Sequence, residues 1–245
     1  MIRRKKLTAL LGRSDIPEEA KVEVRKVLAN NKVVLPGWSP TFLRRIGNMD
    51  TVIDVGVLEG TPALYQAFPD ARLILVEALP GYEQKCRQLL AAHPGGGDVH
   101  MCAVGAEDGS ATIRHYPNLP ATSSLLETES GRQSEVVRID VPLRRLDGLV
   151  KPERLVGNVL LKIDVEGMEL EVLKGAVGIL PHVRCIIAET SIRKRHRNSY
   201  RFADLVAFLM SHGFHLYDAL RVTRTEAMRP GASIMDAVFI SESKW

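Results

Sequence analysis

Short apolar runs alternate with helical segments from residue 51 onward, and this alternation constrains the fold more than any other feature. The runs are rich in Val, Ile and Leu and end in glycine or an acid, which is typical of strands buried on both faces. Alternation at this spacing predicts a doubly wound α/β domain with a mostly parallel sheet. The expected strands are 51–56, 73–77, 99–104, 159–164 and 183–189, and the expected helices are 62–68, 81–92, 169–180 and 202–212.

The remaining segments predict additions to this sheet. Residues 111–116 and 136–141 are expected to form extra strands around a polar loop at 117–134. Residues 214–217 and 237–240 are expected to form a closing hairpin.

The first part of the chain predicts a helical cap. Ser14 or Asp15 caps a helix with Pro17 in its first turn, and Asn30 with Asn31 ends it. We therefore expect a cap at 1–48 and one compact domain at 49–245.

Composition excludes several classes of protein. Aromatic residues make up only 5% of the 245 residues and the formal net charge is +4, which disfavours a nucleic-acid surface built on stacking. The three cysteines are an odd number at wide spacing, which argues against a disulfide framework or a zinc site. No apolar stretch approaches the roughly 20 residues of a membrane helix, so we expect a cytoplasmic enzyme without a membrane partner.

The turn after the first strand indicates a ligand site. Gly56 and Gly60 follow Asp54 in the segment Asp-Val-Gly-Val-Leu-Glu-Gly-Thr and let backbone approach a ligand closely. Glu77 ends the next strand, 21 residues after Gly56, where a carboxylate can bind a ribose diol. Together they predict an adenosine-containing ligand. The alternative is that both glycines only pack a tight turn.

The spacing of these glycines bears on which ligand is bound. A nicotinamide dinucleotide site carries G-x-G-x-x-G, which seats a pyrophosphate. This chain has G-x-x-x-G instead, which favours a ligand with an amino-acid tail. A nucleotide-dependent dehydrogenase is kept as an alternative.

Five segments together resemble the FkbM family of methyltransferases. They are Val52–Gly56 with Gly60–Pro62, Leu75–Glu77, Ala103–Gly105, Leu161–Glu169 and Leu173–Ala176, in which K-x-D-x-E-G-x-E is the specific part. The likeness runs from about residue 51 to 240. It implies a Rossmann-like fold with a seven-stranded sheet closed by an antiparallel strand. It also implies S-adenosylmethionine as cofactor and methyl transfer to a hydroxyl of a sugar or natural product. Many members have Asn where this chain has Leu58, and Glu59 is expected to take over part of its role.

The resemblance assigns cofactor contacts residue by residue. Asp54, Gly56 and Gly60 are expected along the methionine part, with Glu59 and Thr61 in the same loop. Glu77 is expected at the ribose, with Ala78 beside it. The segment Cys102, Ala103 and Val104 is expected at the adenine, and Asp164 at the cofactor from the fourth strand. The Cys102 side chain has a plain alternative as a small buried group.

Two acidic residues at neighbouring strand ends raise the question of a metal. Asp164 and Glu189 lie 25 residues apart, one strand–helix–strand step, so their carboxylates are expected to be neighbours. Oxygen ligands of this kind suit Mg²⁺, which would lower the pKa of a bound hydroxyl. The alternative is that Asp164 touches only the cofactor, and Glu189 only a substrate hydroxyl or an arginine. Glu166 and Glu169, around Gly167, suit the start of a helix.

Deprotonation of an acceptor hydroxyl calls for a base. His196 is the first candidate because it follows Glu189 at the same edge of the sheet, and His115 is the second. The basic loop at 193–197 is expected to grip a polar acceptor or to form a solvated lid. A lid is also expected at 117–134, with Ser123 and Ser124 facing the ligand.

The resemblance to the FkbM family, together with these patterns, implies an O-methyltransferase that acts on a small polar molecule, with a saccharide or glycosylated metabolite favoured as acceptor. Asp164 and His196 are the expected catalytic residues. The alternatives are an RNA methyltransferase, the dehydrogenase already named and a non-enzymatic RNA-binding module. The segment Asp164–Gly167 does not look like a clamp for a flipped base. The sequence leaves monomer and homodimer open.

Overall fold

The computed structural model describes residues 18, 21, 35–127, 135–224 and 232–244. The chain divides into two compact units, Met1–Leu35 and Pro36–Trp245, and the second contains the elements described below. The predicted N-terminal helix falls almost entirely outside the described residues, so the cap stays a prediction. Residues 36–48, expected in that cap, belong to the larger unit, because Leu43 and Ile46 are buried in its core.

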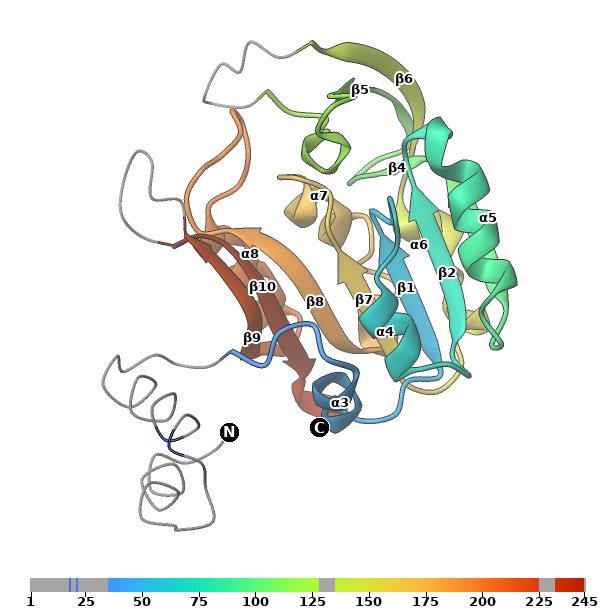
Figure 1. Cartoon of the computed structure of the whole chain (residues 1–245), viewed down its shortest axis with the longest axis vertical. Coiled ribbons are helices and arrows are strands. Elements are labelled where there is room, and N and C mark those ends of the chain that lie inside the picture. The colour runs from blue at the N-terminus through green and yellow to red at the C-terminus, as the bar shows by residue number, and fades with distance from the viewer. Residues whose placement is uncertain (1–17, 19–20, 22–34, 128–134, 225–231, 245) are drawn as a thin grey trace. The chain divides into compact units, whose positions relative to one another are not determined.

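The main sheet contains seven strands among the described residues, in the order β3-β2-β1-β7-β8-β10-β9 (Figure 1). The first five are parallel to one another, and β10 is antiparallel to both of its neighbours. This confirms the predicted α/β class and the antiparallel closing strand. The strands are β1 Thr51–Val55, β2 Arg72–Glu77, β3 Gly97–Met101, β7 Val159–Ile163, β8 Val183–Ser191, β9 Phe214–Arg224 and β10 Ala232–Ser241.

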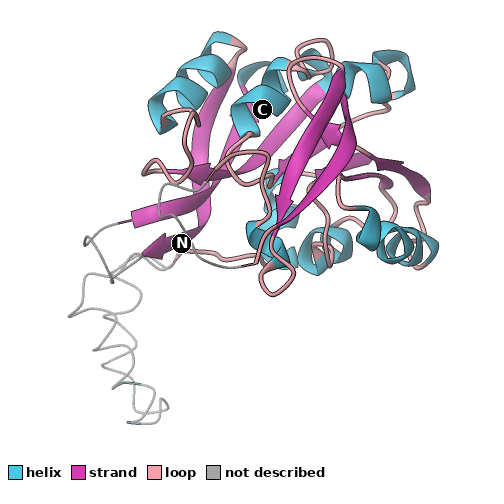
Figure 2. Ribbon diagram, turned by 90° about the horizontal axis from the view of Figure 1, so that it is seen from above, coloured by secondary structure: helices cyan, strands magenta, loops and turns pink. Residues whose placement is uncertain are grey.

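Helices cover both faces of this sheet (Figure 2). Alternate residues of each strand supply the two cores: Val52 and Leu160 face one side, while Ile53 and Leu161 face the other. The first side packs against α3 Pro40–Leu43, α4 Pro62–Ala67 and α5 Glu83–Ala91, and the second against α6 Leu146–Leu149, α7 Glu169–Lys174 and α8 Phe202–Ser211. Short 3₁₀ turns occupy 44–46, 80–82, 120–122, 152–154, 180–182 and 242–244.

Strand order reverses between β1 and β7. The chain leaves β1 toward β2 and β3, whereas β7 leads to β8 on the other side. The loops that follow β1 and β7 therefore diverge and leave a crevice at the carboxyl ends of the strands, which is where such sheets bind ligands.

A smaller sheet lies beyond this end of the main sheet (Figure 1). It contains β4 Ala103–Val104, β5 Gly109–His115 and β6 Val137–Arg144, with β6 in the middle. The predicted single strand 99–104 is therefore wrong: the main sheet pairing ends at Met101, and Ala103 pairs with β6 instead.

Two other boundaries differ from the prediction. The helix expected at 169–180 ends at Lys174, and the next residue, Gly175, lies so close to the carbonyl oxygen of Gly105 that a Cβ would be 2.0 Å from it. The closing hairpin is longer than 214–217 and 237–240, since β9 and β10 pair along most of their length. Among the helices in the described residues, none has the length and apolar character to span a membrane.

Gly56 provides a test of the close packing between β1 and β7, where the strand order reverses. Its φ is +82°, and a Cβ there would lie 1.9 Å from the carbonyl oxygen of Asp164. We expect Gly56→Ala to lower the free energy of unfolding by more than about 2 kcal/mol, because backbone must move on two strands. Gly148→Ala in α6, where a Cβ meets nothing within 4 Å, should change it by about 1 kcal/mol or less. Urea unfolding measures both, and equal midpoints would refute the close packing.

Candidate active site

A cavity of about 470 Å³ opens at the carboxyl ends of β1, β2, β7 and β8. This volume falls within the range of about 300–1,000 Å³ typical of small-molecule sites. Among the residues predicted to contact a cofactor, those in its wall are Gly56, Glu59, Gly60, Thr61, Glu77, Ala78, Cys102, Ala103, Val104 and Asp164. The structure thus gathers all of the predicted contacts except Asp54 around one space, together with Glu189.

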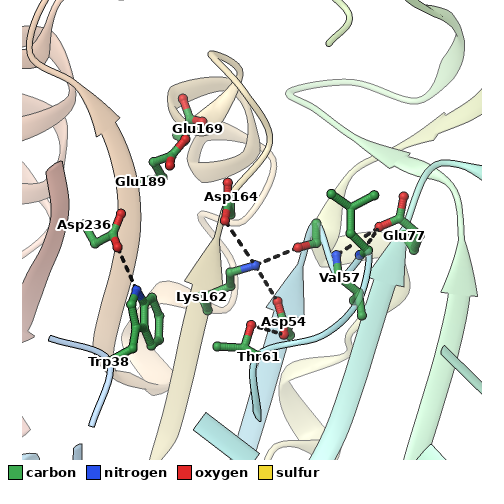
Figure 3. A network of polar contacts seen from close by, with 12 residues as sticks. Trp38, Asp54, Val57, Thr61, Glu77, Lys162, Asp164, Glu169, Glu189 and Asp236 are labelled. Atoms are coloured by element: carbon green, nitrogen blue, oxygen red, sulfur yellow. Dashed lines mark hydrogen bonds and ion pairs between the residues drawn. The ribbon is translucent and has the colours of Figure 1, made fainter. Parts of the chain in front are cut away.

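Glu77 holds the loop after β1 in place. One carboxylate oxygen accepts hydrogen bonds from the amides of Val57 and Leu58 at 2.9 and 2.8 Å (Figure 3), and the other accepts a hydrogen bond from the amide of Leu79 at 2.8 Å. These bonds hold Leu58 at φ +45°, a conformation that disfavours a side chain of this kind and that Asn tolerates better. Glu77 therefore shapes the loop, and its contact with a ribose stays a prediction.

Asp54 lies beneath the cavity rather than in its wall. It is fully buried, and its carboxylate accepts hydrogen bonds from the hydroxyls of Thr61 at 3.1 Å and Tyr65 at 2.6 Å. Its other oxygen pairs with the Lys162 ammonium at 3.0 Å. Asp54 supports the loop through these partners.

Lys162 joins the two strands at the reversal point. Its ammonium donates to the carbonyl of Gly56 at 2.6 Å, pairs with Asp54 and lies 3.6 Å from a carboxylate oxygen of Asp164 (Figure 3). Burial opposes its charge, yet these two carboxylates outweigh burial and raise the pKa of Lys162. The sequence pattern assigned no role to Lys162, although a charged side chain inside the apolar run Val-Leu-Leu-Lys-Ile indicates a buried ion pair.

Acidic side chains gather at the other end of the cavity. Asp164, Glu166 and Glu189 each place a carboxylate oxygen within 4.8 Å of the others. Arg195 lies 2.8 Å from Glu166 and 3.6 Å from Glu189, and Arg221 lies 3.1 Å from the second oxygen of Glu189. The neighbouring carboxylates of Asp164 and Glu189 were predicted, and an arginine at Glu189 was the stated alternative to a metal; the structure places two arginines there.

Burial and mutual repulsion change the acidity of this cluster. Burial raises the pKa of Glu166 to about 7, with Arg195 opposing the rise and Asp164 adding to it. Burial and the charges of Asp164 and Glu166 raise the pKa of Glu189 to about 8. Both groups therefore exchange protons near neutral pH.

The donor set does not fit a resident magnesium ion. The carboxylate spacing alone would admit a divalent cation. However, both oxygens of Glu189 and one oxygen of Glu166 already face guanidinium groups. Because these oxygens already face guanidinium groups, they are not free to coordinate Mg²⁺.

A second layer of contacts holds Arg221. Its Nε lies 2.9 Å from the buried carboxylate of Asp236 on β10, and the indole of Trp38 donates to the same oxygen at 2.7 Å (Figure 3). Arg221 itself lies in the cavity wall. The segment before α3 therefore supports the site, a link that nothing in the sequence pattern predicted.

His196 is not in the cavity wall. Its side chain is 2% exposed and packs against Gly167, where a Cβ would lie 2.7 Å from Nδ1. His115 bonds to the hydroxyl of Ser123 at 3.0 Å and is also outside the wall, whereas Ser123 and Ser124 line it as predicted. Among the described residues of the wall there is no histidine, so the structure does not bring either predicted base to the cavity.

An apolar surface closes the cavity on the side of the small sheet. Ala103, Ile113 of β5 and Leu79 form one buried cluster, against which Tyr82 packs. Burial raises the pKa of the Cys102 thiol to about 11, so this group stays protonated and behaves as a small apolar side chain. This wall suits a flat, weakly polar ring.

Lys162 provides a test of the buried ion pair. Lys162→Met should lower the free energy of unfolding by about 3–5 kcal/mol, because Asp54 is left as an uncompensated buried charge. Adding Asp54→Asn should recover part of that loss. Lys174→Met, at a half-exposed pair on α7, should cost about 1 kcal/mol or less. Urea denaturation compares the variants, and a mild effect of Lys162→Met would contradict the arrangement.

Glu189 provides a test of pH dependence. Because its pKa is raised, the folded protein binds more protons than the unfolded chain between about pH 4.5 and 8. The free energy of unfolding should therefore fall as pH rises through this window. Glu189→Gln should reduce that fall by about 2 kcal/mol, while Glu83→Gln on the exposed face of α5 should not. Parallel slopes for Glu189→Gln and the unmodified protein would show that Glu189 titrates normally.

The family model named Methyltransferase FkbM domain matches residues 54–216. "Methyltransferase sdnD" of Sordaria araneosa is 29% identical over 153 residues, which cover 51% of this chain and 59% of that protein. "Methyltransferase 1" of Beauveria bassiana (strain ARSEF 2860) is 29% identical over 142 residues, which cover 51% and 57%. The chain thus spans less than two thirds of the length of these curated relatives.

Among solved structures, the magnesium protoporphyrin IX methyltransferase (ChlM) of Synechocystis PCC 6803 with bound SAM is 13% identical. The alignment covers 98% of this chain and 90% of that one, with a TM-score of 0.43. The family match includes the strand ends that form the cavity, from Asp54 to Glu189. The chain belongs to the FkbM family of methyltransferases.

Proposed function

We propose that this methyltransferase binds S-adenosylmethionine across the ends of β2, β1 and β7 and transfers its methyl group to a hydroxyl of a neutral, polar acceptor. The observation that carries the proposal is the single cavity that joins the Glu77-held loop at one end to the cluster of Asp164, Glu166 and Glu189 at the other. One end offers a site for an adenosine, and the other offers acceptors for hydroxyl protons.

The cavity wall matches the parts of the cofactor in order. The apolar surface of Leu79, Cys102 and Ala103 suits the adenine ring. Glu77 lies beside it, and its Oε1, which accepts one backbone amide, keeps a second lone pair for a ribose hydroxyl. The loop at 56–61 then runs along the place for the methionine tail.

The acidic end favours an acceptor rich in neutral hydroxyls. Asp164 is the most accessible of the three carboxylates, with 39% of its side chain exposed, and it can accept a hydrogen bond from an acceptor hydroxyl. A phosphate or carboxylate entering here would meet like charges. A saccharide or glycosylated metabolite therefore fits better than a nucleic acid, whose backbone is anionic.

The reaction follows from placement of the two reactants. The acceptor oxygen attacks the methyl carbon in line with sulfur, the carbon–sulfur bond breaks and its electron pair stays on sulfur. The hydroxyl proton passes to the acidic cluster or to solvent. Alignment of oxygen and carbon supplies most of the rate, and Asp164 is proposed to orient the hydroxyl.

Calorimetric titration with S-adenosylmethionine and S-adenosylhomocysteine tests the cofactor assignment. We expect at least one of them to bind at micromolar concentration, and Glu77→Ala to weaken this binding about 100-fold, because the loop amides lose their acceptor. Glu83→Ala, an exposed residue of α5, should bind as the unmodified protein does. A chelator should leave affinity unchanged.

Failure of the unmodified, folded protein to bind either compound would refute the proposed function. Transfer of labelled methyl groups to a panel of neutral glycosides then tests the acceptor class. Transfer confined to anionic acceptors would overturn that part alone.

A further inference from the structure

We propose that the carboxylates of Asp164, Glu166 and Glu189 recognise the positive charge of the sulfonium, so that the cavity holds S-adenosylmethionine more tightly than the uncharged product S-adenosylhomocysteine. This inference rests on the proposed function. It adds a role for the acidic cluster that does not depend on which acceptor is methylated.

The connectivity of the cofactor places its charge beside this cluster. The sulfonium sulfur is bonded to the ribose on one side and to the methionine chain on the other. With the ribose at Glu77 and the methionine chain along 56–61, the sulfonium would lie between them, and its methyl group would face the part of the wall that neither of them covers. That part of the wall contains Asp164, Glu166 and Glu189.

The nearby cations do not cancel these carboxylates. Lys162 is shared between Asp164 and the buried Asp54, and Asp54 is the closer at 3.0 Å. Arg221 is likewise shared between Glu189 and the buried Asp236.

Arg195 serves both Glu166 and Glu189. Across these ion pairs, three cations face five carboxylates, which leaves an excess of negative charge directed at the cavity. Burial raises the pKa of Glu189 most, and the charges of Asp164 and Glu166 add to this rise.

Charge balance gives this arrangement a consequence for turnover. Methyl transfer converts the cationic sulfonium and a neutral hydroxyl into a neutral thioether, a neutral ether and one proton. The attraction that holds the cofactor therefore disappears when the methyl group leaves. The product is released more readily than the substrate cofactor, which limits product inhibition.

The test compares ligands that differ in charge at one position. S-adenosylmethionine carries a sulfonium, sinefungin carries a protonated amine in its place, and S-adenosylhomocysteine carries a neutral thioether. At pH 8.5, which is above the raised pKa values of Glu166 and Glu189, calorimetry should show the two cationic ligands binding about tenfold more tightly than the neutral one.

Variants that remove either a negative or a positive charge make the test specific. Glu189→Gln and Glu166→Gln should each lower the ratio of the affinity for S-adenosylmethionine to that for S-adenosylhomocysteine about threefold or more. Arg221→Gln should raise this ratio, because it removes a cation. Glu171→Gln, at the half-exposed pair on α7, should leave the ratio unchanged. Thermal unfolding confirms that each variant is folded.

Each outcome bears on one proposal. Binding of all three ligands with equal affinity, or a ratio that none of the cluster variants moves, would overturn the sulfonium inference and leave the cofactor assignment intact. No binding of any of the three to the folded, unmodified protein would instead refute the proposed function.

Discussion

The buried ammonium of Lys162 is the interaction on which the site depends. A cation in the interior is stable only when oxygen atoms replace its water, and here Asp54, the carbonyl of Gly56 and Asp164 do so. Because these partners come from β1 and β7, the ammonium ties together the two strands at which the sheet reverses direction. The ammonium therefore fixes the position of the loop after β1, which would hold the methionine chain.

The carboxylates in the cavity wall have two different roles. Glu77 accepts hydrogen bonds from three backbone amides, so most of its hydrogen-bonding capacity fixes the shape of the first loop. Glu189 and Glu166 face guanidinium groups shared with other acids, so part of their charge remains directed at a ligand. The same functional group therefore has a structural role at one end of the site and an electrostatic role at the other, and the difference lies in the donors around it.

Patterns local in sequence predicted the parts of the site that lie at strand ends. Gly56, Glu77, Asp164 and Glu189 each follow a recognisable buried run, and parallel strands bring their ends to one edge, so the shared cavity could be foreseen. The position of His196, the predicted base, could not be foreseen. It follows the expected strand, yet its side chain packs against Gly167 and lies outside the cavity wall. A side chain's direction in a loop is set by packing, which has no periodic signature.

The sequence by itself determined the order of strands and helices, the family, and which residue types stand at the carboxyl edge, because burial patterns and the K-x-D-x-E-G-x-E segment are written in adjacent residues. Only the tertiary structure decided which charges meet. Arg221 and Asp236 lie on β9 and β10, and Trp38 comes from a segment ahead of the first strand, yet Trp38 donates to Asp236, Asp236 pairs with Arg221, and Arg221 pairs with Glu189. Contacts between residues so far apart along the chain depend on how the whole sheet packs. That packing brings acids and arginines from several strands into one site with an excess of negative charge.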